Sequence, residues 1–300
     1  IKSAKEKTGR NVVVLIDEYD KPMLQAIGYE ELQIQFRNML KAFYGTLKSA
    51  DGYLRFVLLT GVTKFSKLSI FSDLNNIEDI SMEKQYCDIC GITEEELHNV
   101  FDNEVALLAE NNEQTKEEAY KELKKRYDGY HFSENSVGIY NPFSILLALK
   151  NSNYGSYWFS TGTPTYLVEL LKRFDYSLEN LSGYEASATT LDSIQLNVDN
   201  PIPVLYQSGY LTIKGYDREL RLYTLDFPNE EVEEGFVNFL IPMYPSVSEM
   251  DSPSFIGKFV REVRAGKVDD FMRRLQSMMA DTPYEIIKDL ENHYQNVMFI

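Results

Sequence analysis

The sequence predicts an α/β protein in which a parallel sheet is followed by a mostly α-helical segment and then by a winged-helix-like α+β region. Unbroken aliphatic runs at residues 12–16 and 56–59, separated by a long stretch of helical periodicity, predict the sheet. Alternating strand patterns near residues 211–227 predict the later hairpin. We expect four segments: a partial nucleotide-binding-type core at 1–85, a helical lid at 86–160, a winged-helix-like region at 161–245 and a helical connector at 246–300.

Residues 1–85 alternate strands with helices. Gly9 is expected at the C-cap of a first short helix. The continuous aliphatics at 12–16 are typical of a parallel strand that is buried on both faces. After the second strand, we expect a short helix at 67–71 and a third strand at 77–81.

The segment after residue 85 carries clear helix-start signals. Thr93 and Glu96 form a capping-box pattern, and Asn141 followed by Pro142 is typical of an N-cap and first helical residue. A further helix is expected at 116–126. Later helices are expected at 164–172, at 203–210, from Asn229 to about Leu240, and along the apolar stripes beginning at Phe255 and Phe271.

The composition limits the classes of function. A net charge of −16 argues against free-standing nucleic-acid binding, because a phosphate backbone demands a basic surface. No apolar run approaches the roughly 20 residues of a membrane helix, so no membrane partner is expected. Two cysteines cannot form a disulfide framework, which favours a reducing, cytoplasmic compartment.

The two ends of the sequence suggest an internal piece of a longer protein. The chain opens at Ile1 without a Met, and it closes on the apolar run HYQNVMFI. An unpaired sheet edge would then be left exposed, so association into homo-oligomers or poor solubility is expected.

Two acids follow the first predicted strand, in NVVVLIDEYDKP. The carboxyl end of a strand in an open α/β sheet faces the ligand crevice. Asp17 at that point could hold Mg²⁺, and Glu18 could polarise the water that attacks a γ-phosphate. This is a Walker B interpretation. The alternative is that Asp17 caps the next helix or makes a turn.

The second strand also ends in hydroxyl side chains. FVLLTGVTKFS places Thr60 at the strand end and Thr63 close behind it. Thr60 is a candidate γ-phosphate sensor and Thr63 a candidate nucleotide contact, whereas an ordinary strand-to-loop Thr is the alternative for each.

Taken together, a series of segments resembles the family of AAA-like ATPases that carry a C-terminal PD-(D/E)XK nuclease-like domain. The segments, in order, are LIDEYDKP, RFVLLTGVTKFSKLSIFSDLNNIEDISM, ICGITEEEL, RYDGYHFS, YNPFSILLAL, YWFSTGTPTYLVELLK and QSGYLTIKGYD. The resemblance implies a P-loop ATPase core that uses ATP and Mg²⁺, with Walker B roles for Asp17 and Glu18 and a sensor role for Thr60.

Two parts of that family pattern are absent from the sequence. Nothing matches G-x-x-x-x-G-K-[ST], so the phosphate-binding loop is missing, and so is the nuclease-like domain. The E-x-K at residues 122–124 falls on an expected helix, whereas the nuclease motif needs a strand. Nucleic acid is therefore expected as a partner only through the missing domain.

Two further candidates are weighed against simpler interpretations. Arg126 ends a lid helix and could contact nucleotide, although a helix C-cap covered by aromatic side chains also explains RYDGYHF. Cys87 and Cys90 form a C-x-x-C without the second ligand pair that a structural zinc site needs, which favours incidental packing.

The sequence therefore predicts the middle part of an ATPase that couples its nucleotide state to a nuclease-like domain. By itself this piece is expected neither to bind ATP tightly nor to hydrolyse it. Two alternatives stay open. One is a non-catalytic interaction module with a relic acid pair, and the other is a DNA nuclease that the ATPase part regulates.

Overall fold

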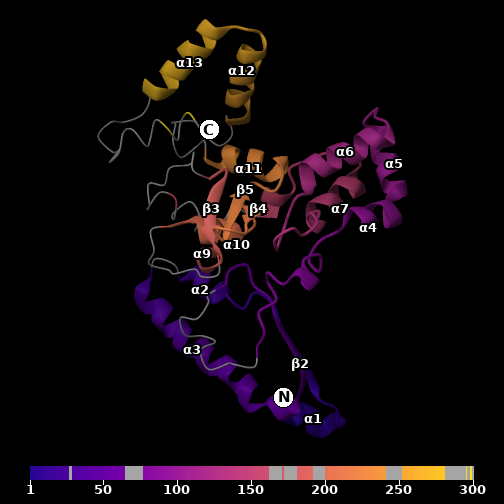
Figure 1. Ribbon diagram of the computed structural model, residues 1–300, viewed down its shortest axis with the longest axis vertical. Coiled ribbons are helices and arrows are strands. Elements are labelled where there is room, and N and C mark those ends of the chain that lie inside the picture. The colour runs from indigo at the N-terminus through magenta and orange to yellow at the C-terminus, as the bar shows by residue number, and fades with distance from the viewer. Residues whose placement is uncertain are drawn as a thin grey trace.

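The computed structural model describes residues 1–26, 29–64, 77–161, 171, 181–191, 200–240, 252–280, 295 and 298. Figure 1 shows an N-terminal α/β part, a group of helices, a central part with a small antiparallel sheet, and a helical hairpin near the C-terminal end. The helices predicted at 67–71 and 164–172 lie outside the described residues, apart from residue 171. None of the described helices is long and apolar enough to cross a membrane.

The N-terminal part is a two-stranded parallel sheet with a long crossover helix. Its elements are α1 (Lys2–Thr8), β1 (Val12–Ile16), α2 (Lys21–Gln25), α3 (Glu30–Ser49), a 3₁₀ turn (Asp51–Tyr53) and β2 (Leu54–Leu59). β1 and β2 pair in parallel, with Val13 opposite Phe56 and Ile16 opposite Leu59. The predicted parallel α/β arrangement is confirmed, as is Gly9 at the C-cap of α1 with φ 70°.

The two faces of this sheet differ in burial. Val14, Ile16, Val57 and Leu59 pack into the main hydrophobic core, together with Phe36 and Leu40 of α3. The other face exposes four large apolar side chains, those of Val13, Leu15, Phe56 and Leu58. Burial on both faces was predicted and is wrong for the described residues, because α3 covers a single face of the sheet.

The strand predicted at 77–81 is also wrong. Within the described part of the chain, residues 77–80 have no regular secondary structure, and residues 81 and 82 form a turn. The Ser81 N–H donates to Asp79 Oδ1 at 3.1 Å, and the Asp79 carboxylate pairs with Lys64. Asp79 therefore bends the chain locally and offers the backbone an alternative to a sheet ladder.

The group of helices contains α4 (Glu94–Val100), α5 (Asp102–Asn111), α6 (Lys116–Tyr127) and α7 (Pro142–Asn151), preceded by a 3₁₀ turn (Lys84–Tyr86). The Thr93 capping box and the Asn141 cap are confirmed. A second capping box, between Thr115 and Glu118, starts α6. These helices enclose a core of their own, which includes Leu97, Leu108, Leu123, Tyr127, Tyr140 and Ile145.

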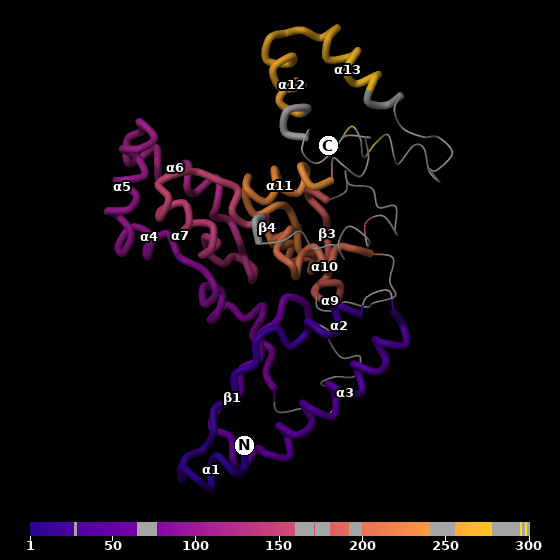
Figure 2. Tube along the Cα trace, turned by 180° about the vertical axis from the view of Figure 1, so that it is seen from behind, coloured from indigo at the N-terminus to yellow at the C-terminus, as the bar shows by residue number. Residues whose placement is uncertain are grey.

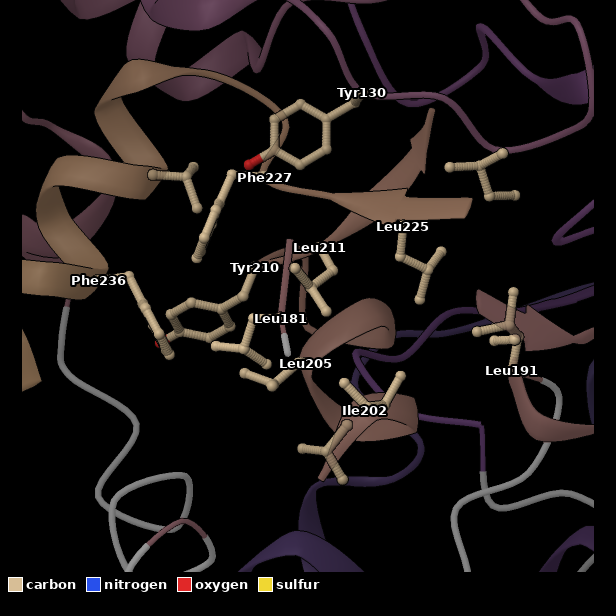
Figure 3. Packing of buried hydrophobic residues seen from close by; sticks show 14 of the residues in the cluster. Tyr130, Leu181, Leu191, Ile202, Leu205, Tyr210, Leu211, Leu225, Phe227 and Phe236 are labelled. Atoms are coloured by element: carbon tan, nitrogen blue, oxygen red, sulfur yellow. The ribbon is translucent and has the colours of Figure 1, made fainter. Parts of the chain in front are cut away.

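The central part is an antiparallel sheet of order β3-β5-β4 with short helices. Its elements are β3 (Tyr184–Ser187), α9 (Ala188–Leu191), α10 (Ile202–Gln207), β4 (Thr212–Asp217), β5 (Leu222–Asp226) and α11 (Glu230–Leu240). Figure 3 shows the side chains of Leu205, Tyr210, Leu211 and Phe236 packed between sheet and helices. The predicted hairpin is confirmed, whereas the helix predicted at 203–210 ends at Gln207.

The remaining described helices are α12 (Ser252–Arg264) and α13 (Val268–Ala280), which contact each other. Figure 2 shows this pair at the opposite end of the molecule from α1. Phe259 and Phe271 meet edge to face at 5.4 Å between ring centres, and Arg274 pairs with Glu262 across the two helices.

A buried carboxylate joins the group of helices to the central part. Glu231, on α11, is 1% exposed, and its Oε1 accepts the N–H groups of Tyr157 and Trp158 at 2.6 and 3.0 Å. On the same helix, a Cβ at Gly235 would lie 2.0 Å from the Phe159 ring, so a glycine is required for this close packing. Residues 157–159 are therefore fixed to α11 by both backbone and ring contacts.

Burial raises the pKa of Glu231 above its ordinary value of 4.5, opposed by the Ser144 hydroxyl and by the two N–H donors. Ser144 thus lies near Glu231, although neither Glu231 Oε2 nor the Ser144 hydroxyl has a hydrogen-bond partner among the described residues. The contribution of Glu231 to stability is thus full below pH 4.5 and is lost as the pH rises through the folded-state pKa.

We therefore expect Glu231→Gln to reduce the loss of stability between acidic and neutral pH, because the amide keeps an acceptor for both N–H groups without a buried charge. Glu231→Ala should lower the free energy of unfolding by about 2 kcal/mol or more, because it leaves two donors unpaired. Denaturant unfolding at several pH values checks both. Glu234→Gln, at an exposed site of the same helix, is the control, and an unchanged pH profile in Glu231→Gln would contradict the assignment.

Candidate functional site

The loops that follow β1 and β2 are joined side by side. The Thr60 hydroxyl donates to Asp17 Oδ1 at 2.5 Å. Two backbone bonds continue the ladder, from the Thr60 N–H to the Ile16 carbonyl at 2.8 Å and from the Tyr19 N–H to the Thr60 carbonyl at 3.0 Å. Asp17 and Thr60, which lie 43 positions apart, therefore meet at the carboxyl ends of adjacent parallel strands, and both are exposed.

Glu18 occupies a strained position beside this pair. Its φ of 51° lies in the left-handed region, which is uncommon for residues other than glycine. Such strain tends to persist at functional sites, where the surrounding contacts enforce it. The Glu18 carboxylate pairs with Lys21 at 2.6 Å, and hydrogen bonding to Glu18 raises the pKa of Lys21. Both side chains are more than half exposed, so this pair adds little stability.

Asp20 fixes the two loops from the inner side. It is 1% exposed and accepts three hydrogen bonds, from the Val62 N–H at 3.3 Å, the Thr63 N–H at 2.5 Å and the Thr63 hydroxyl at 2.7 Å. The Tyr19 hydroxyl also donates to the Thr63 carbonyl at 3.0 Å. A buried carboxylate is tolerated here because donors from the other loop satisfy it.

Gly61 permits this close approach of the two loops. A Cβ at position 61 would lie 2.5 Å from Asp20 Oδ1 and 2.7 Å from the Tyr19 ring. Those separations are too short for any side chain, so a larger residue would push Asp20 and Tyr19 away from the β2 loop.

The exposed pair of Asp17 and Thr60 is suited to a magnesium ion. Asp17 Oδ1 accepts the Thr60 hydroxyl and the Glu18 N–H, whereas Asp17 Oδ2 has no hydrogen-bond partner among the described residues. Mg²⁺ is usually bound by one or two carboxylates together with substrate phosphates and water. The donor set of Asp17 and Thr60 is therefore suitable for a metal–phosphate ligand.

The structure separates two of the predicted site residues from this pair. Thr63 is 2% exposed, and its amide and its hydroxyl both donate hydrogen bonds to Asp20. Arg126 pairs with Glu122 at 2.5 Å, and its guanidinium lies 6.0 Å from the centre of the Tyr154 ring. No recorded contact between described residues links Arg126 to the Asp17 loop.

Sequence reasoning missed Asp20 and Lys21. The signal for Asp20 was present, because Asp17 and Asp20 have the same three-residue spacing as Thr60 and Thr63. The two pairings found in the structure, Asp17 with Thr60 and Asp20 with Thr63, follow that spacing across the parallel strands.

The C-x-x-C has no metal-site geometry of its own. Cys87 is half-buried and Cys90 is exposed, and both are free thiols. Within the part of the chain that the structure describes, no three His, Cys, Asp or Glu side chains are grouped so that they could hold a metal ion.

The hydrogen bonds from Val62 and Thr63 to Asp20 form a clamp between the two loops. Loss of this clamp should destabilise the N-terminal part. We expect Asp20→Ala to lower the free energy of unfolding by about 3 kcal/mol, because it leaves buried N–H donors without an acceptor. Thr63→Val should cost roughly 1 kcal/mol, and Thr63→Ser should cost less because it keeps the hydroxyl. Denaturant unfolding measures these differences against Asp88→Ala at an exposed position. Equal stability of Asp20→Ala and the unmodified protein would refute the clamp.

Comparisons with known proteins agree with part of the resemblance. A protein of Azotobacter chroococcum mcd 1, described as an uncharacterized protein in the vnfD 5′ region, is 36% identical over 249 residues. The match covers 81% of this chain and 45% of that protein, so the chain spans less than half the length of this relative. No solved structure matches the chain. Residues 1–71, which contain Asp17, Glu18 and Thr60, match the family model described as a predicted AAA-ATPase and are thus an AAA-ATPase-like region.

Proposed function

We propose that this chain provides part of a site that binds and hydrolyses ATP with Mg²⁺. The observation that carries the proposal is the contact of 2.5 Å between the Thr60 hydroxyl and Asp17 Oδ1 at the ends of two parallel strands. Ligands of open α/β sheets bind at this edge. The match of residues 1–71 to an AAA-ATPase-like family supports nucleotide as the ligand.

Each residue then has a distinct role. Asp17 would hold Mg²⁺ through its carboxylate, and Thr60, which already donates to Asp17, would reorient its hydroxyl toward a γ-phosphate oxygen. The bound metal ion supplies neutralisation of the phosphate charge. Phosphoryl transfer depends mainly on positioning and charge, so two fixed oxygen groups on neighbouring strands are a suitable basis.

Glu18 would act as the general base that orients and activates the attacking water. In the structure its carboxylate is bound to Lys21, so it must leave Lys21 before it can accept a proton from water. The Glu18 backbone is in the left-handed region, and the residue is exposed at the edge that carries Asp17.

Thr63 and Arg126 enter the proposal with altered roles. Thr63 supports the site from the inner side through Asp20, instead of contacting nucleotide directly. Arg126 would serve as a lid cation only after release from Glu122.

For the longer protein, we propose that nucleotide state is coupled to a nuclease-like domain and, through it, to nucleic acid. The second candidate function is protein interaction. It is favoured by the exposed apolar face of Val13, Leu15, Phe56 and Leu58, because contiguous exposed apolar side chains often mark binding surfaces.

The water-activating role is tested by Glu18→Gln in the full-length protein. We expect kcat for ATP hydrolysis to fall by about 100-fold or more, because the amide cannot accept the proton, with ATP binding retained. The control is Glu31→Gln, at an exposed position in the first turn of α3. Steady-state phosphate release and fluorescent-nucleotide binding provide the two measurements. If neither the unmodified protein nor the variant hydrolyses ATP, the interaction function is favoured.

The phosphate-sensing role is tested by a pair of substitutions at Thr60. Thr60→Ser should keep kcat within about threefold, whereas Thr60→Val should lower it by roughly 100-fold, as expected for removal of one oriented donor. A Thr60→Val enzyme with unchanged kcat would exclude this role.

A further inference from the structure

A side chain from the central part reaches the loop that follows β2. Gln207, the last residue of α10, accepts the Lys64 N–H on its Oε1 at 2.5 Å. Its Nε2 donates to the Leu191 carbonyl of α9 at 2.7 Å. One amide group therefore joins three segments, and Gln207 is also the first residue of the QSGYLTIKGYD segment.

Other contacts also hold the loop at 60–64, among them the pairing of the Lys64 side chain with Asp79. At its start, Thr60 is held by Asp17 and by the backbone ladder. In the middle, Asp20 holds Val62 and Thr63. These bonds come from the β1 loop, only 43 or so positions away, whereas the Lys64–Gln207 bond spans 143 positions and comes from another part of the molecule.

The element that carries Gln207 is well anchored. Ile202, Val204 and Leu205 of α10 are each 4% exposed or less and belong to the main core. Gly209, with φ 83°, turns the chain directly after the helix, and Tyr210 then returns to the core. The Gln207 amide is thus presented to the β2 loop from a packed support.

We propose that Gln207 is a positioning residue for the candidate ATP site. By holding the Lys64 N–H, it fixes the far end of the loop that carries Thr60, and so sets where the Thr60 hydroxyl lies relative to Asp17. The inference rests on the proposed ATPase function and adds a residue from α10 to that site. It also gives the central part a direct means to influence hydrolysis.

Two substitutions separate the two bonds of this amide. Gln207→Glu keeps an oxygen acceptor for the Lys64 N–H but loses the donor to the Leu191 carbonyl. Gln207→Met has a similar length and neither group. Gln35→Met, on an exposed position of α3, is the matched control. Each variant is compared with the unmodified full-length protein, and circular dichroism and thermal unfolding identify variants that fail to fold.

The first readout is steady-state ATP hydrolysis. We expect Gln207→Met to lower kcat about tenfold or more while KM for ATP changes less than about threefold, because a small displacement of a reacting group lowers rate more than binding. Gln207→Glu should stay within about threefold of the unmodified protein. A general loss of folding would not give this split between kcat and KM, nor rescue by Glu.

The second readout is hydrogen exchange of the amides of residues 61–64 without nucleotide. We expect faster exchange in Gln207→Met and unchanged exchange in Gln207→Glu and Gln35→Met. Unchanged exchange in a folded Gln207→Met protein overturns the inference. So does faster exchange with unchanged kcat, which leaves the proposed function intact. If the unmodified protein hydrolyses no ATP, the proposed function fails and this inference fails with it, whatever the exchange shows.

Discussion

The parallel pairing of β1 with β2 is the constraint on which the rest of the N-terminal part depends. Its register places Ile16 opposite Leu59, so the next residues, Asp17 and Thr60, leave the sheet side by side. A slip of one residue would separate that pair. It would also exchange the buried and exposed faces of the slipped strand, because side chains alternate along a strand. Register therefore specifies both the core and the polar edge.

Acids in one short segment have different roles because their environments differ. Asp17 lies at the surface, and its Oδ2 makes no hydrogen bond to a described residue. Asp20 is buried, and both of its carboxylate oxygens accept hydrogen bonds from the opposite loop. A buried carboxylate without donors would be costly. Asp20 therefore specifies how the loops pack. The carboxylates of Asp17 and Glu18 are exposed and do not hold the loops together in this way.

A similar arrangement links the other parts of the molecule. Glu231 holds the backbone of residues 157 and 158 on α11, and Gln207 holds the backbone of residue 64. In both places a polar side chain on a packed helix binds N–H groups of an irregular segment. Such segments have no ladder of their own, so their placement depends on these side chains. A change in the central part could thus reach both the helical group and the candidate site.

The local features of this protein follow from short sequence signals. Aliphatic runs specified β1 and β2, the Thr93 and Asn141 caps specified helix starts, and alternation specified the β4–β5 hairpin, because each signal acts within a few residues. Asp17 and Thr60 were identified because both follow strands. Three other outcomes appear only in the folded molecule: one sheet face stays exposed, Asp20 binds Thr63, and Gln207 reaches Lys64. Those outcomes depend on which segments meet across 43 or 143 positions, and the matching spacing of the Asp and Thr residues becomes informative only once the parallel pairing is known.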